Sequence, residues 1–149
     1  MSQKKSPSKY ADGTSVPITQ SQAEIRNIVE KNGGRFFSLM SNGLKQSDMI
    51  LFALPGSINP PLFVKFEIIR PDDRFGNDKQ IAAEERRLWR SLLLIIKSGF
   101  ECANTGFTSI EQAFFGFICT KDNMTVYQTL MPQLIEHYQN NQPVKGLLG

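Results

Sequence analysis

Four carboxylates around residues 67–78 are the side chains best suited to hold a catalytic metal ion: Glu67, Asp72, Asp73 and Asp78. A magnesium-dependent nuclease needs such carboxylates to converge on the ion together with a lysine. Pro71-Asp72 resembles the start of a nuclease motif, but the Asp/Glu-x-Lys triplet that completes the motif does not follow at a sensible spacing. The pattern therefore favours a solvated loop before a helix, and a nuclease using Glu67, Asp72 and Asp73 is the weakest functional alternative.

Other reactive side chains are few. His137 is the only histidine, and Cys102 and Cys119 are too far apart for a metal-binding or redox motif. The sequence contains no G-x-S-x-G, no phosphate-binding P-loop and no G-x-G-x-x-G. We predict a protein that is not an enzyme, with no cofactor, no metal and two reduced thiols.

Basic side chains recur along residues 77–104 at helical spacing. The stripe consists of Lys79, Arg86, Arg90 and Lys97, with Arg87 beside it. Spacings of 7, 4 and 7 return to nearly the same angle, and the stripe would span about 27 Å at 1.5 Å per residue. Because arginine forks fit phosphate, we predict that the stripe contacts a nucleic-acid backbone. The alternative is the ordinary polar face of an amphipathic helix, diluted by Glu84, Glu85 and Glu101.

A second feature of the same kind lies in the predicted strands. Phe63 and Lys65 share one side of residues 62–70, and Arg35 and Phe37 share one side of residues 35–40. Aromatic and cationic side chains on an open sheet form a stacking platform for single-stranded nucleic acid. The alternative, favoured by eleven phenylalanines and three further helices, is that the helices cover this side, so that Phe63 and Phe37 belong to the core.

The elements that position these residues can be read from periodicity. Residues 77–104 form a long amphipathic helix, capped by Asn77 and Gln80, with an apolar face of Ile81, Leu88, Trp89, Leu92, Ile95, Ile96, Phe100 and Ala103. Strands are predicted at 35–40, 48–54 and 62–70, and shorter helices after capping boxes at Ser21, Thr108 and Thr125. The predicted fold is α+β: a three-stranded antiparallel sheet packed on the long helix, with three shorter helices.

Length and composition set the remaining limits. A chain of 149 residues suits a single domain at 18–149 after a disordered basic tail at 1–17. The net charge of +3 is mildly favourable to binding polyanions. No apolar run approaches the roughly 20 residues of a membrane span. The composition therefore predicts a cytoplasmic protein.

Several short motifs follow one another along the chain: S-x-x-E-I at Ser21, R-x-x-W-R-x-L-L-L-x-I-K at Arg86, T-x-x-E-x-x-F at Thr108, T-V at Thr125, P-x-L at Pro132 and the late Leu147-Leu148. In this order they resemble the pattern of a group of small, uncharacterised proteins carried by phages, prophages and related mobile elements. Ser98-Gly99-Phe100 departs from the pattern, where a better helix former is expected. The resemblance implies a viral or mobile-element setting in a bacterial cytoplasm, and it implies no activity.

These observations predict a non-enzymatic nucleic-acid-binding protein, most simply for single strands, that acts in phage or mobile-element replication or recombination. Arg86, Arg90 and Lys97 would contact phosphates, with Lys79 and Arg87 at the edge, and Phe63 and Lys65 would contact bases. Replacing Arg86 and Arg90 with alanine should then weaken polyanion binding and leave melting nearly unchanged. The alternative is an anti-defence or host-takeover protein that binds a host protein or a nucleotide signal. A homo-oligomer is compatible with either function.

Overall fold

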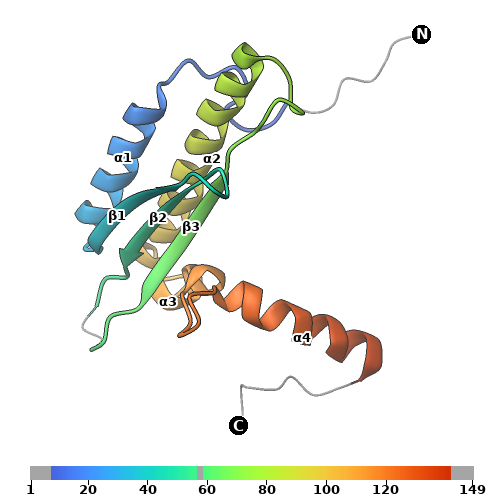
Figure 1. Ribbon diagram of the computed structural model, residues 1–149. Helices are drawn as coiled ribbons and strands as arrows, with labels where there is room; N and C mark the ends of the chain where they lie inside the picture. Colours follow the sequence, from blue (N-terminus) through green and yellow to red (C-terminus); the bar gives the residue numbers. More distant parts are fainter. Residues whose placement is uncertain (1–7, 57–58, 142–149) are drawn as a thin grey trace.

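The computed structural model describes residues 8–56 and 59–141. Within these residues the chain has an α+β fold, in which three antiparallel strands form one layer and the helices at 18–31 and 78–104 form the other (Figure 1). None of the helices in this part of the chain is long and apolar enough to cross a membrane. In chain order the elements are α1 (Ile18–Lys31), β1 (Arg35–Asn42), β2 (Ser47–Ala53), β3 (Phe63–Ile69), α2 (Asp78–Asn104), α3 (Ile110–Ala113), the 3₁₀ helix η1 (Phe115–Phe117) and α4 (Val126–Asn140).

The sheet has the predicted strands in the order β1-β2-β3, and both pairings are antiparallel. A turn at 43–46 joins β1 to β2, and the Asn42-Gly43 pair at its start is a combination that favours tight reversals. Side chains alternate between two faces along each strand. Ile50, Phe52, Val64, Phe66 and Ile68 are buried on one of them, which we call the inner face.

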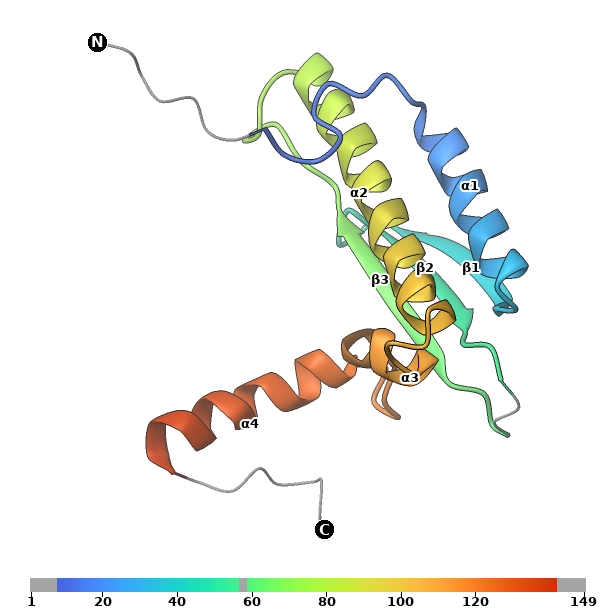
Figure 2. The ribbon, with the colours of Figure 1, turned by 180° about the vertical axis from the view of Figure 1, so that it is seen from behind.

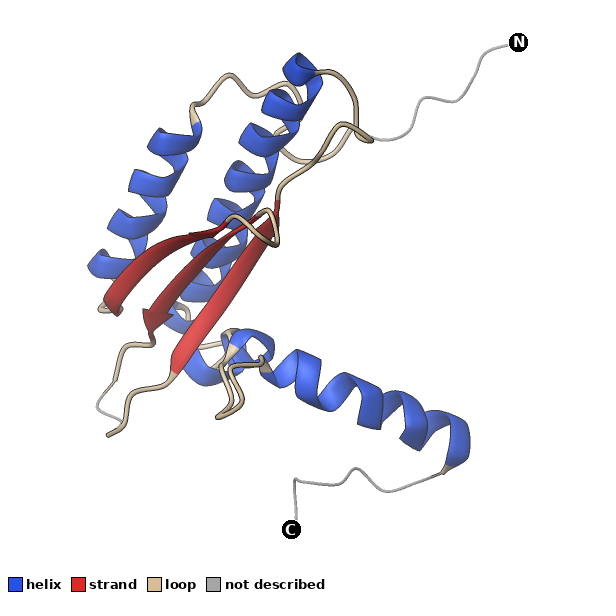
Figure 3. Ribbon diagram, viewed as in Figure 1, coloured by secondary structure: helices blue, strands red, loops and turns tan. Residues whose placement is uncertain are grey.

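Helices α1 and α2 both cover the inner face, and within the described part of the chain no helix lies over the other side (Figures 2 and 3). The prediction that the sheet packs on the long helix is confirmed. Trp89, Ile96 and Phe100 of α2 are buried against the inner face, and Ile25 and Val29 of α1 complete the core. The favoured alternative, in which shorter helices cover the opposite face, is wrong, because α1 lies beside α2 in the same layer.

The apolar face of α2 is rotated slightly from the predicted one. Leu93 is buried and Ile95 is exposed, although periodicity alone assigned Ile95 to the core. The reason is that α1 packs along one flank of α2 and leaves the opposite flank in solvent. The predicted N-cap is confirmed, since Asn77 and Gln80 form a reciprocal capping box.

The start of α1 differs from the prediction. The helix begins at Ile18 after Pro17, so Ser21 lies inside the helix, where it is buried. The segment before α1 also differs from the predicted disordered tail. Asp12 and Thr14 close turns with Lys9 and Ala11, and this segment rests against α2. Residues 1–7 lie outside the described residues.

Beyond α2 the chain forms a compact junction and then leaves the body of the molecule. Ser109, one residue after the predicted cap, begins the four-residue helix α3. Phe114 inserts into the core, and residues 118–125 form a minimal hairpin that bridges to Val64 of β3. The capping box of Thr125 and Gln128, as predicted, starts α4, and α4 continues through Pro132 and projects away from both layers (Figure 1).

Candidate nucleic-acid interface

Arg90 of α2 lies between α1 and α2 and contacts α1. Its guanidinium group forms an ion pair and a hydrogen bond with the carboxylate of Glu24. Hydrogen bonds from Arg90 and, to a smaller extent, from Gln20 lower the pKa of the Glu24 carboxyl group. Arg90 is therefore part of the contact between α1 and α2.

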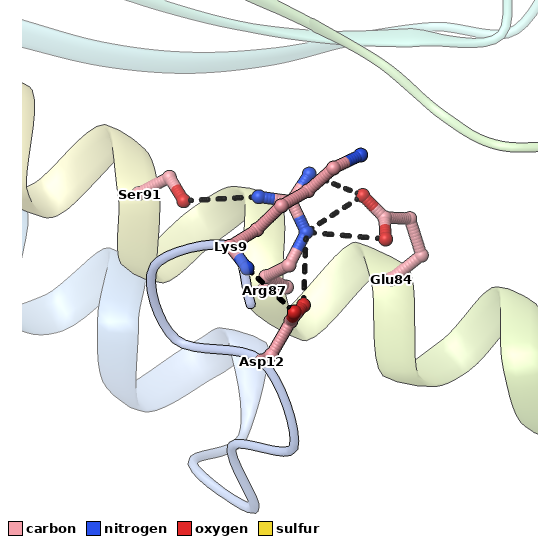
Figure 4. Close-up of polar contacts among 5 residues, drawn as sticks. All are labelled: Lys9, Asp12, Glu84, Arg87 and Ser91. Atoms are coloured by element: carbon pink, nitrogen blue, oxygen red, sulfur yellow. Dashed lines mark hydrogen bonds and ion pairs between the residues drawn. The ribbon is translucent and has the colours of Figure 1, made fainter. Parts of the chain in front are cut away.

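Arg87 is held by three side chains (Figure 4). It pairs with Glu84 one turn earlier, lies 3.9 Å from Asp12 of the N-terminal segment, and donates to the hydroxyl of Ser91. The hydrogen bond that Arg87 donates to the Glu84 carboxylate raises the pKa of Arg87, and only 13% of the Arg87 side chain is exposed. A guanidinium group with this set of partners has little remaining capacity for a phosphate.

The rest of the stripe is divided. Arg86 is half-buried and donates from Nε to the backbone oxygen of Thr14 at 3.3 Å. Lys79 and Lys97, at the two ends, are exposed, and neither forms an ion pair within residues 8–56 and 59–141. The stripe therefore does not form one exposed basic surface. Its two arginines and the adjacent Arg87 attach α1 and the N-terminal segment to α2, and of the stripe residues only Lys79 and Lys97 face open solvent.

The other predicted site lies on the uncovered side of the sheet, which we call the outer face. The strand register places three cross-strand rows there: Ser38, Leu51 and Lys65; Met40, Met49 and Glu67; and Asn42, Ser47 and Ile69. Phe63 lies at one end of this face beside Ala53. The predicted positions of Phe63 and Lys65 on one side of β3 agree with the structure.

A β-bulge changes which aromatic residue of β1 joins the outer face. The register shifts between Arg35 and Ser38, and Phe36 adopts a left-handed conformation with φ of 57°. Phe37, a candidate for the stacking platform that the favoured alternative assigned to the core, packs against the core and under the guanidinium group of Arg26. Phe36 takes the outer position, where 63% of it is exposed.

Phe36 and Phe63 form an aromatic pair at this end of the sheet. Their ring centroids are 6.2 Å apart, and Ala53 of the central strand, which is fully buried, pairs with Phe63 on one side and with Arg35, the neighbour of Phe36, on the other. Alanine is small enough to let rings from β1 and β3 meet above β2. The guanidinium group of Arg35 lies 5.7 Å from the centre of the Phe36 ring, and this is within the range of a cation–π contact.

Lys65 lies at the border between the outer face and the start of α4. Its ammonium group donates to the backbone oxygen of Asn123 at 2.7 Å. A groove of about 510 Å³ adjoins it, lined by Lys65, Glu67, Gly116, Phe117, Thr125, Tyr127 and Gln128. An ammonium group has three donor hydrogens, so the bond to Asn123 leaves two for a ligand.

The carboxylates considered for a nuclease are not gathered. Asp72 forms an ion pair and several hydrogen bonds with Arg74, which lower its pKa. Within residues 8–56 and 59–141, no group of three or more histidine, cysteine, aspartate or glutamate side chains is placed to hold a metal ion. Cys102 and Cys119 are free thiols, and burial raises the pKa of Cys119.

Sequence reasoning missed Phe36 as a candidate because alternation assigns it to the opposite side from Phe63. The one available signal was the pair of adjacent phenylalanines after Gly33-Gly34, where either ring could face outward. In comparisons with known proteins, no family model, no curated protein and no solved structure matches this chain.

Proposed function

We propose that this chain is a non-enzymatic protein that binds single-stranded nucleic acid on the outer face of its sheet. The observation that carries the proposal is the aromatic pair of exposed Phe36 and half-buried Phe63, flanked by Arg35 and Lys65 on a sheet side that no helix of the described residues covers. Unpaired bases stack on such rings, and nearby cations neutralise the backbone phosphates. The setting implied by the sequence motifs is phage or mobile-element replication or recombination.

The proposal moves the binding site away from the helix stripe. Arg86, Arg87 and Arg90 have partners within the chain, so replacing Arg86 and Arg90 with alanine should lower the melting temperature and leave binding almost unchanged. This expectation is the reverse of the one drawn from the sequence. Lys79 and Lys97 remain candidates for additional contacts with phosphate.

The test is fluorescence anisotropy with labelled single-stranded DNA, single-stranded RNA and duplex DNA at low and moderate salt. Phe36→Ala should weaken binding to single strands by about 5- to 150-fold, because a stacked base contributes about 1–3 kcal/mol. Phe107→Ala is the matched control, since Phe107 is a highly exposed phenylalanine in the loop after α2. The control should bind like the natural chain.

Three outcomes separate the candidate functions. Salt-sensitive binding that depends on Phe36 supports the proposal. Binding that is equally strong in Phe36→Ala and Phe107→Ala contradicts the outer-face site. No binding to any of the three probes at low salt excludes the function itself and favours the second candidate, a host-protein partner, for which the mixed surface of Met40, Glu67 and Ile69 is the supporting observation.

A further inference from the structure

Within residues 8–56 and 59–141, most of the apolar face of α4 is exposed, and only its edge at Val126 and Leu130 is half-buried. All fifteen of its residues are described, and none of them is buried. At 100° per residue, the apolar side chains occupy about half of the helix circumference along its full length. They are Val126, Tyr127, Leu130, Met131, Leu134, Ile135 and Tyr138.

The spacing within this face is that of a helix–helix seam. Tyr127, Met131, Leu134 and Tyr138 are separated by 4, 3 and 4 residues, as the a and d positions of a heptad repeat are. A second helix therefore fits this face better than a flat surface does. Tyr127 and Tyr138 are 62% and 85% exposed, so the seam is open at both ends.

We propose that α4 pairs antiparallel with α4 of a second copy of this chain. In a two-fold antiparallel pair of identical helices, the residue numbers of any two facing seam residues add up to the same total. Here 127 with 138 and 131 with 134 both give 265. The seam is thus complementary to itself under the symmetry of an isologous dimer.

The base of α4 carries a feature that receives the tip of the partner helix. Antiparallel pairing brings Tyr138 of one copy to Tyr127 of the other, beside the groove of about 510 Å³ lined by Phe117, Gly116 and Glu67. Phe117 and Tyr127 offer apolar contacts to the ring, and Glu67 or Lys65 offers a hydrogen-bond partner to its hydroxyl group.

Charge and area are both compatible with self-association. Glu136 is the only Asp, Glu, Lys or Arg side chain in α4, so two copies approach with little repulsion. A tyrosine can bury about 150–250 Å², so Tyr127 and Tyr138 alone offer roughly 300 Å² per copy. Met131, Leu134, Ile135 and the groove bring each copy to roughly 600 Å², the lower limit of a specific interface.

The first test is the oligomeric state of the full chain, measured by light scattering and sedimentation from low to high micromolar concentration. The natural chain should form dimers, and Leu134→Arg should raise the dissociation constant at least 10-fold. Gln139→Arg introduces the same group away from the seam near the same helix end, and it should dimerise normally. Because no residue of α4 is buried, both variants should keep the melting temperature of the monomer.

The second test is the direction of pairing. Single cysteines at 127 and at 138, introduced by Tyr127→Cys and Tyr138→Cys with Cys102 and Cys119 replaced by serine, should cross-link when the two variants are mixed. Tyr138→Cys alone should not cross-link to itself. A chain that stays monomeric at every concentration, a dimer indifferent to Leu134→Arg, or preferential 138–138 cross-links would each overturn the proposal.

Discussion

The contact between Arg90 and Glu24 is the clearest case in which a single residue has a different role from the one its position suggests. Both side chains are partly exposed, at 21% and 39%. The pair joins the middle of α1 to the middle of α2, and Arg87 and Arg86 extend the same contact to Asp12 and Thr14. These arginines hold two segments on the long helix, so their charge serves the fold.

Replacing Glu24 with glutamine should make stability less dependent on acid. The folded-state pKa of Glu24 lies below its usual 4.5, so the pair stabilises the fold above that pH and loses this contribution as pH falls through the folded pKa. Because Glu24 is more than a third exposed, Glu24→Gln should cost only about 0.5–1 kcal/mol at pH 7.

Urea unfolding at pH 7 and at pH 3 measures this difference. The two proteins should differ at pH 7 and converge at low pH. Glu30→Gln is the control, since Glu30 pairs with Arg26 on the surface of a single helix and should change stability by less. A difference in free energy of unfolding that is the same at pH 7 and at pH 3 would show that the ionisation of Glu24 does not contribute to stability.

At the same scale, Phe36 shows why alternation failed on β1. The bulge turns one residue into a left-handed conformation, and the following side chain moves to the opposite face. Phe36 and Phe37 have the same side chain, so composition cannot decide which of them faces the core. Packing decides, because the inner position is occupied by Phe37 next to Arg26 and the core.

At the scale of elements, Gly99 explains how α2 meets α3. A Cβ atom at Gly99 would lie 2.5 Å from the ring of Phe114, which is itself buried against Phe52, Phe66 and Phe100. Gly99 has a low helix propensity, but its missing side chain leaves the space into which the segment after α2 inserts the ring of Phe114. α2 is continuous through it from Asp78 to Asn104.

Gly99→Ala should therefore destabilise the protein by about 1–3 kcal/mol, as expected for overpacking of a closed core. Helix propensity alone predicts the opposite sign, a gain of up to about 1 kcal/mol. Ser98→Ala is the control at the adjacent exposed position and should change stability by less than about 0.5 kcal/mol. Thermal or urea unfolding measures both, and a stabilised Gly99→Ala would show that Phe114 can move aside.

The beginnings of helices were predicted with unequal success for a physical reason. Asn77 and Thr125 cap their helices, and Gln80 and Gln128 return the reciprocal hydrogen bonds. Ser21 and Glu24 have the same local pattern, but Glu24 is bound by Arg90 and Ser21 is buried. A capping box is a local signal, and here a contact with another helix replaces it.

At the scale of the whole molecule, the two layers and the projecting α4 differ in how much of their surface is packed. α2 buries Trp89 and Ile96 under the sheet, and α4 mainly contacts η1. Local openings require less free energy where few apolar contacts must be broken. The amides of α4 should therefore exchange with solvent much faster than those of α2 in dilute solution.

Hydrogen exchange followed by mass spectrometry tests this expectation at two concentrations. At high concentration the protection of α4 should rise if α4 pairs with a second copy, and that of α2 should stay the same. Leu134→Arg is the internal control, because its α4 should remain unprotected at both concentrations. Equal protection of α4 and α2 in a dilute monomer would mean that α4 packs on its own chain.

The sequence by itself determined the α+β class, the three strands, the long helix, and the capping boxes that start α2 and α4. Periodicity and capping depend on residues close in the chain. Only the tertiary structure decided which faces stay open. Arg86, Arg87 and Arg90 have helical spacing whether or not α1 lies beside them, and Phe36 or Phe37 can occupy the inner position of β1. These choices depend on contacts between segments distant in sequence, such as Glu24 with Arg90 and Phe36 with Phe63.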